Sequence, residues 1–218
     1  MQSKIKVALV DDHILLRHAL ANLISHSDKY FVNIEASNGK DFIEKLSTNN
    51  IPDVAILDLN MPVMDGQETA EWLLENHPDM HVLMLTMYDS ELVLIRLLKA
   101  GVKGFMKKDI HPTELMYAIQ SVLENGYYYS AHTSSKLAGL FKEGDNKTPL
   151  FQKVMLSNVE LDFLKLASTE MTYKEIAQKM KMNPRAIDGI RDTLFTRLDV
   201  KSRVGLAMYA IRHGLVTF

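Results

Sequence analysis

Carboxylate, hydroxyl and ammonium side chains stand at the ends of several apolar runs in the first half of the chain. Asp11 and Asp12 follow the first run, Asp58 closes a later one, and Thr86 and Lys108 come near the ends of two more. Three clustered carboxylates repel one another unless a cation lies among them, and hard carboxylate oxygens suit Mg²⁺. A carboxylate in such a site can attack a phosphoryl group as a nucleophile. These residue types therefore predict a magnesium site with phosphoryl chemistry.

The elements that must position these residues follow from the pattern of the first 124 residues. Short apolar runs alternate there with segments whose apolar residues are spaced by three or four. The runs predict strands at 5–10, 31–37, 53–59, 81–87 and 103–108, and the spaced segments predict helices at 15–25, 41–47, 67–75, 90–99 and 112–123. This alternation predicts a flavodoxin-like, doubly wound α/β fold with five parallel strands and five helices. Ligands of such sheets bind at the carboxyl ends of the strands, where the polar residues gather.

Four motifs in this half resemble the receiver domains of bacterial two-component response regulators. They are VDDH (10–13), ILDLNMPVMDG (56–66), LTMYD (85–89) and GFMKKD (104–109). The resemblance implies that a sensor histidine kinase phosphorylates Asp58. It also implies Mg²⁺ ligands at Asp11, Asp12, Asp58 and the backbone carbonyl of Asn60, and switch roles for Thr86, Phe105 and Lys108. The new charge would draw Thr86 and Lys108 inward and repack the surface formed by 90–99, 104–107 and 111–124.

Two adjacent lysines could each supply the ammonium group of the site. Lys107 and Lys108 are adjacent, and strand alternation sends their side chains to opposite faces, so only one can reach the site. The alignment of GFMKKD with the family motif, and Phe105 three residues earlier, favour Lys108. His13 follows the acid pair directly and could touch the metal region, but a surface role is expected for it.

Charge and composition separate the chain into two halves. Residues 1–124 carry 11 basic and 18 acidic side chains, whereas residues 125–218 carry 14 basic and 9 acidic ones, so different partners are expected for each half. Asn125-Gly126 and the segment EGDNKTP (143–149) predict a linker at 125–151 with a short helix at 133–141. We therefore expect a receiver domain at 1–124 and a second domain at 152–218.

The second domain has a helical pattern throughout. Two capping boxes begin at Ser157 and Thr172, an Asn-Pro pair begins at Asn183, and Gly214 is a stop signal. These signals predict a small all-α domain of four helices at 157–168, 172–180, 184–198 and 201–213. The second and third of these helices form a helix-turn-helix pattern.

This half resembles the LuxR-type output domain of the NarL/FixJ response regulators, and GYYYS (126–130) resembles the linker of that family. The supporting residues include Leu156, Glu160, Ile187, Leu194 and Leu198, with the runs KEIA (174–177) and KSR (201–203). The resemblance implies binding to double-stranded DNA through the third helix. Homodimerisation on phosphorylation or on DNA is a further expectation. The candidate DNA contacts are Lys174, Lys181, Arg185, Asp188, Gly189, Arg191, Asp192, Arg197, Lys201 and Arg203.

The face of the third helix departs from the family, because Asp188 and Asp192 stand where relatives often carry Lys. Acids that face a phosphate backbone cost affinity. Three interpretations therefore stay open. The domain reads DNA with altered specificity, since Asp can accept a hydrogen bond from cytosine N4. Alternatively, it is a protein-interaction or dimerisation module, or the two acids only pair with Arg185 and Arg191 on a solvated surface.

The function expected from the sequence is that of a phosphorylation-controlled transcriptional regulator. The alternative is a phosphohydrolase with Asp58 as nucleophile, but Asn60 stands where such enzymes carry a general acid, so at most slow autophosphorylation and autodephosphorylation are expected. Hydrophobic residues at 47% and charged residues at 24% indicate a globular protein. Since cysteine is absent and no apolar run reaches membrane-spanning length, a cytoplasmic protein without membrane partners is expected.

Overall fold

The computed structural model describes residues 4–48, 50–87, 91–130, 133–135, 156–213 and 215–216. Contacts within the chain divide it into two compact units. The first comprises residues 1–89 and 94–138, and the second comprises residues 90–93 and 139–218. The domain boundaries expected at 124 and 151 stay a prediction, and so does most of the linker between them, because much of it lies outside the described residues.

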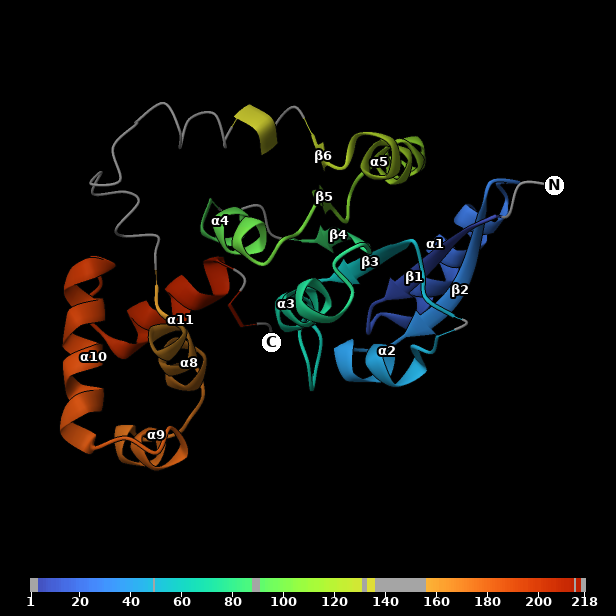
Figure 1. The fold of residues 1–218 in the computed structure, drawn as a ribbon. Helices are drawn as coiled ribbons and strands as arrows, with labels where there is room; N and C mark the ends of the chain where they lie inside the picture. Colours follow the sequence, from blue (N-terminus) through green and yellow to red (C-terminus); the bar gives the residue numbers. More distant parts are fainter. Residues whose placement is uncertain are drawn as a thin grey trace. The chain divides into compact units, whose positions relative to one another are not determined.

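The first unit is a parallel sheet covered by helices on both faces (Figure 1). Its strands are β1 (Ile5–Val10), β2 (Tyr30–Ala36), β3 (Val54–Asp58), β4 (His81–Thr86), β5 (Gly104–Lys107) and β6 (Tyr128–Tyr129). Its helices are α1 (Ile14–Ser25), α2 (Gly39–Lys45), α3 (Gly66–Asn76), α4 (Glu91–Lys99) and α5 (Pro112–Asn125). The strands lie in the order β2-β1-β3-β4-β5-β6, and every neighbouring pair is parallel. The doubly wound fold is confirmed.

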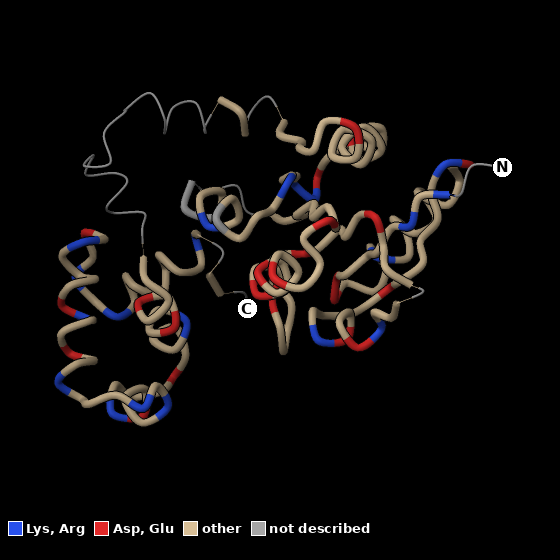
Figure 2. The backbone as a smooth tube through the Cα atoms, in the orientation of Figure 1, with Lys and Arg blue, Asp and Glu red and all other residues tan. Residues whose placement is uncertain are grey.

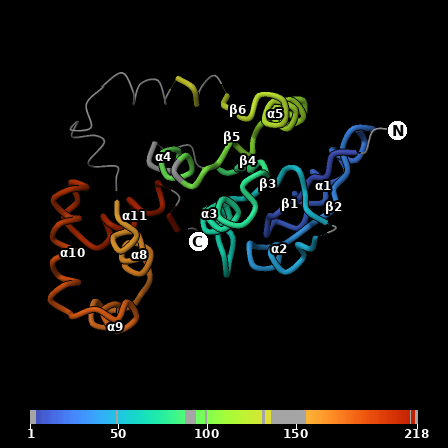
Figure 3. Tube along the Cα trace, in the orientation of Figure 1, coloured from blue at the N-terminus to red at the C-terminus, as the bar shows by residue number. Residues whose placement is uncertain are grey.

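The buried strands explain this architecture. All five residues of β3 are buried, as are five of the six in β4, so both faces of these strands need a covering layer. One layer is formed by α1 and α5, whose Ile24, Leu115 and Ile119 pack against Val7 and Leu9 of β1. Figure 3 traces how the chain crosses over between successive parallel strands. This winding brings the carboxyl ends of β1, β3, β4 and β5 to one edge of the sheet.

The sheet has one strand more than the sequence predicted. Gly126 ends α5 in a left-handed conformation with φ of 82°, and Tyr128 and Tyr129 then pair in parallel with Gly104 and Phe105 of β5. A strand of two residues is too short to produce a periodic signal, so Tyr128 and Tyr129 were expected to belong to the linker. Residues 133–135 are helical, and the rest of the short helix expected at 133–141 lies outside the described residues.

The second unit consists of helices in the part of the chain that the structure describes. They are α8 (Asn158–Ala167), α9 (Tyr173–Lys179), α10 (Pro184–Arg197) and α11 (Arg203–Arg212). Their core is built from fully buried side chains that include Phe163, Ile176, Ile187, Leu194 and Leu206. The four predicted helices are therefore confirmed, while the stop signal at Gly214 falls outside the described residues.

The described helices of both units are all too short or too polar to cross a lipid bilayer.

Candidate functional site

The carboxyl edge of the sheet gathers the polar residues that the sequence singled out. Asp11 follows β1 directly, with its backbone N–H donating to the Ala36 carbonyl at 3.1 Å, and Asp58 is the last residue of β3. Thr86 ends β4 and is completely buried. Asp11 and Asp58 are only 4% and 5% exposed. The sheet therefore holds two of these acids and the hydroxyl in a largely dry environment.

Lys108 completes this edge. Its backbone N–H donates to the Thr86 carbonyl at 2.8 Å, which continues the pairing of β4 and β5 by one residue. Its ammonium lies 2.8 Å from Asp11 Oδ2 and 2.9 Å from Asp58 Oδ2, and the side chain is 6% exposed. Of the two adjacent lysines, it is thus Lys108 whose side chain bridges the acids. A buried ammonium that contacts two carboxylates offsets part of their mutual repulsion.

Burial and ion pairing act in opposite directions on the protonation of Asp58 and of Lys108. Burial raises the pKa of Asp58 to about 6, although the Lys108 ammonium acts in the opposite direction, and Asp11 and Asp12 add to the rise. Burial alone would lower the pKa of Lys108, but the contacts with Asp11 and Asp58 outweigh it and raise that pKa. The ammonium is therefore held charged beside a carboxylate that is costly to ionise, which is the arrangement expected where further negative charge will be bound.

A cluster of ligand atoms lies beside this ion pair. One ligand atom each from Asp11, Asp12, His13 and Asp58 lies within 4.8 Å of the others. His13 Nδ1 is 3.0 Å from Asp11 and 2.9 Å from Asp12, although its side chain remains 67% exposed. His13 lies at the surface, as expected, and also contacts the two acids that precede it in the sequence. Its position directly after the acid pair was the only sequence signal of this contact. The donors are mainly hard carboxylate oxygens, so the cluster fits a divalent cation.

The loop after Asp58 is folded tightly back onto it. The Gly66 N–H donates to the Leu59 carbonyl at 2.9 Å, and a Cβ placed on Gly66 would lie 2.1 Å from the Asp58 carbonyl oxygen. Only glycine permits this approach. Asp65 then caps α3 in a capping box with Glu68. Asn60 lies within this loop, two residues after Asp58. Gly66 therefore fixes the backbone on which Asp58 and Asn60 stand.

The expected switch aromatic is buried beneath the sixth strand. Phe105 is 2% exposed and pairs in register with Tyr129 of β6. Phe105 and Tyr129 line a small cavity of about 10 Å³ together with Leu94 and Leu97 of α4 and Val102. Tyr128 anchors the same strand, because its hydroxyl donates to Glu114 of α5 at 2.6 Å. The start of the linker is thus attached to the sheet at the strand that carries Phe105.

The helix-turn-helix of the second unit is built as its capping signals predicted. Thr172 and Glu175 form a capping box at the start of α9, and the Asn183 side chain caps α10, with Pro184 at its first position. Between the helices, Lys181 adopts a left-handed conformation with φ of 54°, and the Met182 N–H donates to the Ala177 carbonyl. This helix-ending turn sets the direction in which α10 leaves α9.

The exposed face of α10 carries most of the residues expected to contact DNA. Ile187 and Leu194 are fully buried on the inner side. Residues on the opposite side are exposed: Arg185, Asp188, Gly189, Asp192 and Thr196. Lys174, Lys181 and Lys201 are exposed as well. Figure 2 shows acidic and basic positions together along α10, and basic positions gathered on and beside α9.

The remaining three basic candidates make contacts inside the unit. Arg197 donates to Glu160 of α8 at 2.8 Å. Arg203 donates to the carbonyls of Ala167 and Thr169. Arg191 pairs with the two acids of its own helix, as described below. These contacts stabilise the domain and leave Lys174, Lys181, Arg185 and Lys201 as its exposed basic candidates.

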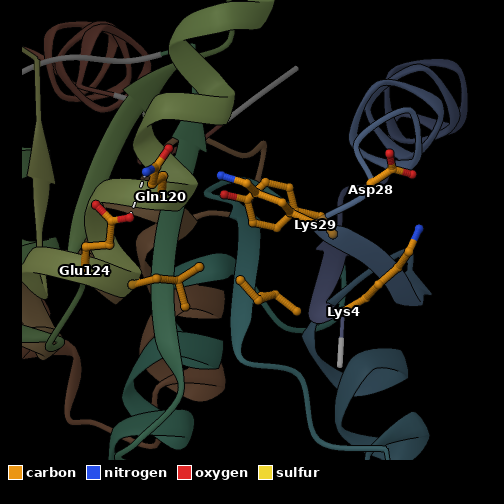
Figure 4. Close-up of a pocket in the computed structure, with 8 residues that line it drawn as sticks. Lys4, Asp28, Lys29, Gln120 and Glu124 are labelled. Atoms are coloured by element: carbon orange, nitrogen blue, oxygen red, sulfur yellow. Dashed lines mark hydrogen bonds between the residues drawn. The ribbon is translucent and has the colours of Figure 1, made fainter. Parts of the chain in front are cut away.

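A larger cavity of about 540 Å³ lies at the opposite edge of the sheet (Figure 4). Gln120 and Glu124 of α5 line one side, where the Gln120 amide donates to the Glu124 carboxylate at 2.7 Å. Lys4, Asp28 and Lys29 line the other, near the amino ends of β1 and β2. Its lining includes no member of the acidic cluster, and ligands of parallel sheets bind at the carboxyl edge. We therefore place the functional site at the acidic cluster.

Comparisons with known proteins agree with this geometry. Residues 7–120 match the family model described as the response regulator receiver domain. Response regulator GacA of Pseudomonas syringae pv. syringae (strain B728a) is 30% identical over 213 residues, which cover 97% of this chain and 98% of that protein. Response regulator UvrY of Escherichia coli (strain K12) is 28% identical over 211 residues, covering 97% and 95%.

The fold of the whole chain also has solved counterparts. One is RcsB from Salmonella enterica serovar Typhimurium, bound to promoter rprA in the presence of the phosphomimetic BeF₃⁻. It has a TM-score of 0.70 and 21% identity, and the match covers 95% of this chain and 98% of that one. This likeness concerns the fold of a receiver domain followed by a helical output domain. The receiver match and the nearly full-length relatives establish that the chain belongs to the response regulators of two-component systems, as its resemblance to the NarL/FixJ family implied.

Proposed function

We propose that this protein is a transcriptional regulator in which phosphorylation of Asp58 controls the binding of the helical domain to double-stranded DNA. The observation that carries the proposal is the Lys108 ammonium, which lies within 2.9 Å of both Asp11 and Asp58 at the buried carboxyl edge of the sheet. A carboxylate held beside a fixed cation can receive a phosphoryl group and then have its new charge balanced.

Asp11, Asp12, Asp58 and the backbone carbonyl of Asn60 would hold Mg²⁺. The bound ion would supply positive charge that offsets the charge of the phosphoryl oxygens. The residues of the chain itself supply the nucleophile and bind the transferred group. Asp58 supplies the nucleophilic oxygen, the Lys108 ammonium pairs with the transferred group, and the Thr86 hydroxyl donates to one of its oxygens. A sensor histidine kinase is the proposed phosphodonor.

The switch follows from the same contacts. When the Lys108 ammonium and the Thr86 hydroxyl bind the phosphoryl group, the carboxyl ends of β4 and β5 repack. Phe105 lies on β5 and pairs with Tyr129 of β6, so the change reaches the first residues of the linker. A two-state element near Phe105, biased by the new charge, is the physical requirement for such a switch.

The helical domain is the proposed reader of DNA. Its four exposed basic candidates, Lys174, Lys181, Arg185 and Lys201, would contact phosphates and position α10 in the major groove. RcsB, whose solved structure shares this fold, is described as bound to promoter DNA. We propose homodimerisation on phosphorylation or on DNA, since two-fold related half-sites are the common mode for such domains.

Slow self-dephosphorylation is the only turnover proposed for this site. Asn60 lies two residues after Asp58, and its amide is too weakly acidic to protonate a leaving group, so a phosphohydrolase would lack its general acid. Sustained catalytic hydrolysis of a simple phosphate monoester would contradict this assignment.

The phosphorylation step is tested by incubating the full chain with acetyl phosphate and Mg²⁺ and measuring its intact mass. We expect one phosphoryl group on the wild type and none on the Asp58→Ala variant. The matched control is Asp79→Ala, which removes an exposed acid of the turn before β4 and should be phosphorylated normally. Equal labelling of the Asp58→Ala variant would contradict the proposal. Phosphorylation without DNA affinity at any salt concentration would favour the interaction-module alternative.

A further inference from the structure

Asp188 and Asp192 form an acidic pair on the solvent face of α10. Their side chains are 52% and 64% exposed, and they lie one helical turn apart. Arg191 contacts both: its Nη1 atom is 2.9 Å from Asp188 Oδ1, and its Nε and Nη2 atoms are 2.9 and 2.8 Å from Asp192 Oδ1. One guanidinium therefore holds two carboxylates through the fork of donors that only arginine offers.

Arg191 is itself fixed to the body of the domain. Its guanidinium lies over the ring of Tyr173 at 5.3 Å from the centroid, and the guanidinium of Arg203 lies 5.4 Å from the same centroid. The Tyr173 ring stacks on Phe163, which is completely buried. Cation–π contacts and stacking thus tie the three charged groups of α10 to the start of α9 and to the core. An arginine side chain held in this way is poorly placed to turn away from its partners and contact a DNA phosphate.

Each carboxylate keeps one oxygen available. Within the described residues, the side-chain contacts of Asp188 and Asp192 all go through Oδ1, so Oδ2 of each exposed carboxylate remains available to an outside donor. An ionised carboxylate oxygen only accepts hydrogen bonds. In the major groove, the amino groups that can donate to it belong to cytosine N4 and adenine N6, and carboxylates pair characteristically with cytosine N4.

Gly189 allows the backbone to come close to such a partner. It lies between the two acids, is exposed, and a Cβ placed on it would meet no atom of the domain within 4 Å. The glycine is therefore not required by packing within the described residues, although it weakens the helix. A glycine at this position is explained if a DNA base must approach the backbone of α10 closely.

We propose that Asp188 and Asp192 are specificity-determining residues that select cytosine in the major groove, and that Arg191 is the positioning residue that aims their carboxylates. This inference rests on the proposed function, since it names the bases that the same DNA-binding helix reads. Arg191 offsets one of the two negative charges and orients the acids toward base edges. The exposed lysines around them contact the phosphates.

The test is selection from a random pool of double-stranded DNA by the full chain, with acetyl phosphate and Mg²⁺ present. We expect the wild type to enrich a motif in which cytosine is fixed at one or two positions of each half-site. Replacing one such cytosine should weaken binding roughly 5- to 150-fold, the range for loss of one good base contact. The Asp188→Asn and Asp192→Asn variants should each shift one position from cytosine toward adenine, because an amide pairs with adenine N6 and N7.

Two further variants separate base reading from charge and from stability. Asp162→Asn removes the same charge from an exposed position of α8 and should leave the cytosine preference intact. Arg191→Lys keeps the charge of Arg191 but loses its fork, so it should broaden the preference at both positions of the selected motif. A positioning role predicts this change in preference, whereas a merely structural role predicts none.

The outcomes distinguish this inference from the function on which it rests. A wild-type motif without fixed cytosine, or asparagine variants with unchanged cytosine frequency, would overturn the base-reading role and leave the DNA-binding function standing. Enrichment of no motif by any variant, with or without the phosphodonor, would overturn both.

Discussion

Tyr129 of β6 lies in register with Phe105 of β5, and both side chains line the same small cavity beside α4. The first residues after the receiver domain are therefore part of its sheet, next to the residue expected to move on phosphorylation. A change at Phe105 can reach the linker through backbone hydrogen bonds and side-chain packing without an intermediate surface.

The variant Tyr129→Ala should uncouple phosphorylation from DNA binding. Truncating this half-buried ring should cost about 1–3 kcal/mol of stability and remove the side-chain packing by which we propose that Phe105 acts on the linker. We expect normal phosphorylation of Asp58 and loss of most of the gain in DNA affinity, measured by fluorescence anisotropy with and without acetyl phosphate. Phe31→Ala, which removes an exposed ring from β2 at the other edge of the sheet, is the control and should keep the gain. An unchanged gain in Tyr129→Ala would show that the signal takes another route.

The variant Gly66→Ala should damage the phosphorylation site. The added methyl group would lie 2.1 Å from the Asp58 carbonyl, so the loop must shift, at a cost of about 2–4 kcal/mol. Urea denaturation should show the loss of stability, and the intact-mass assay should show slower phosphorylation. If both measurements match the wild type, the tight packing of this loop on Asp58 is not functionally important.

Gly189→Ala should have the opposite effect on stability. Nothing in the domain lies within 4 Å of the new methyl group, and alanine favours the interior of a helix by about 1 kcal/mol. The melting temperature should therefore rise. Affinity for the selected DNA should fall on the order of tenfold, which corresponds to about 1.4 kcal/mol, because the methyl group obstructs close approach. A stabilised variant with full DNA affinity would remove the argument for a functional glycine at this position.

Glu160 gives the helical domain a dependence on pH. Burial would raise its pKa, but hydrogen bonds from Ser157 and the pairing with Arg197 outweigh burial and lower the pKa below the usual 4.5. The folded state therefore binds this proton less readily than the unfolded state. The stabilisation is fully present above pH 4.5 and is lost as the pH falls through the lowered value.

The variant Glu160→Gln can still cap the helix but loses the charge that pairs with Arg197, so it should be less stable than the wild type by about 1 kcal/mol at pH 7. The difference should shrink as the pH falls below 4.5. Denaturation curves at several pH values would measure it. A stability difference that stays constant from pH 7 to pH 3 would contradict the assignment of this effect to the Glu160 carboxylate.

The sequence predicted the fold well where many residues carried one signal. Buried strands such as 54–58 and the capping signals at Ser157, Thr172 and Asn183 act locally, so spacing and residue type were sufficient. Strand alternation allowed only one of Lys107 and Lys108 to reach the site, and the alignment of GFMKKD with the family motif favoured Lys108, whose side chain bridges the acids in the structure.

Features that depend on distant parts of the chain were not predictable in this way. The two residues of β6 carry no periodic signal, and their pairing with β5 is a tertiary contact. The spacing of Asp188 and Arg191 left their ion pair as one of three open interpretations of this helix, and the structure contains the pair. The cation–π contact between Arg191 and Tyr173 joins two different helices, however, so residue spacing within one helix could not predict it. Val63 adopts a left-handed conformation with φ of 71°, which is unusual for a β-branched residue and follows from how tightly the loop after Asp58 closes.

The most direct test of the account is the DNA affinity of the full chain before and after phosphorylation, measured on the selected site for the wild type and Asp58→Ala. We predict that acetyl phosphate with Mg²⁺ raises the affinity of the wild type by roughly 5- to 150-fold, the usual range of coupling between two sites, and leaves Asp58→Ala unchanged. Equal affinity of the phosphorylated and unphosphorylated wild type would contradict it.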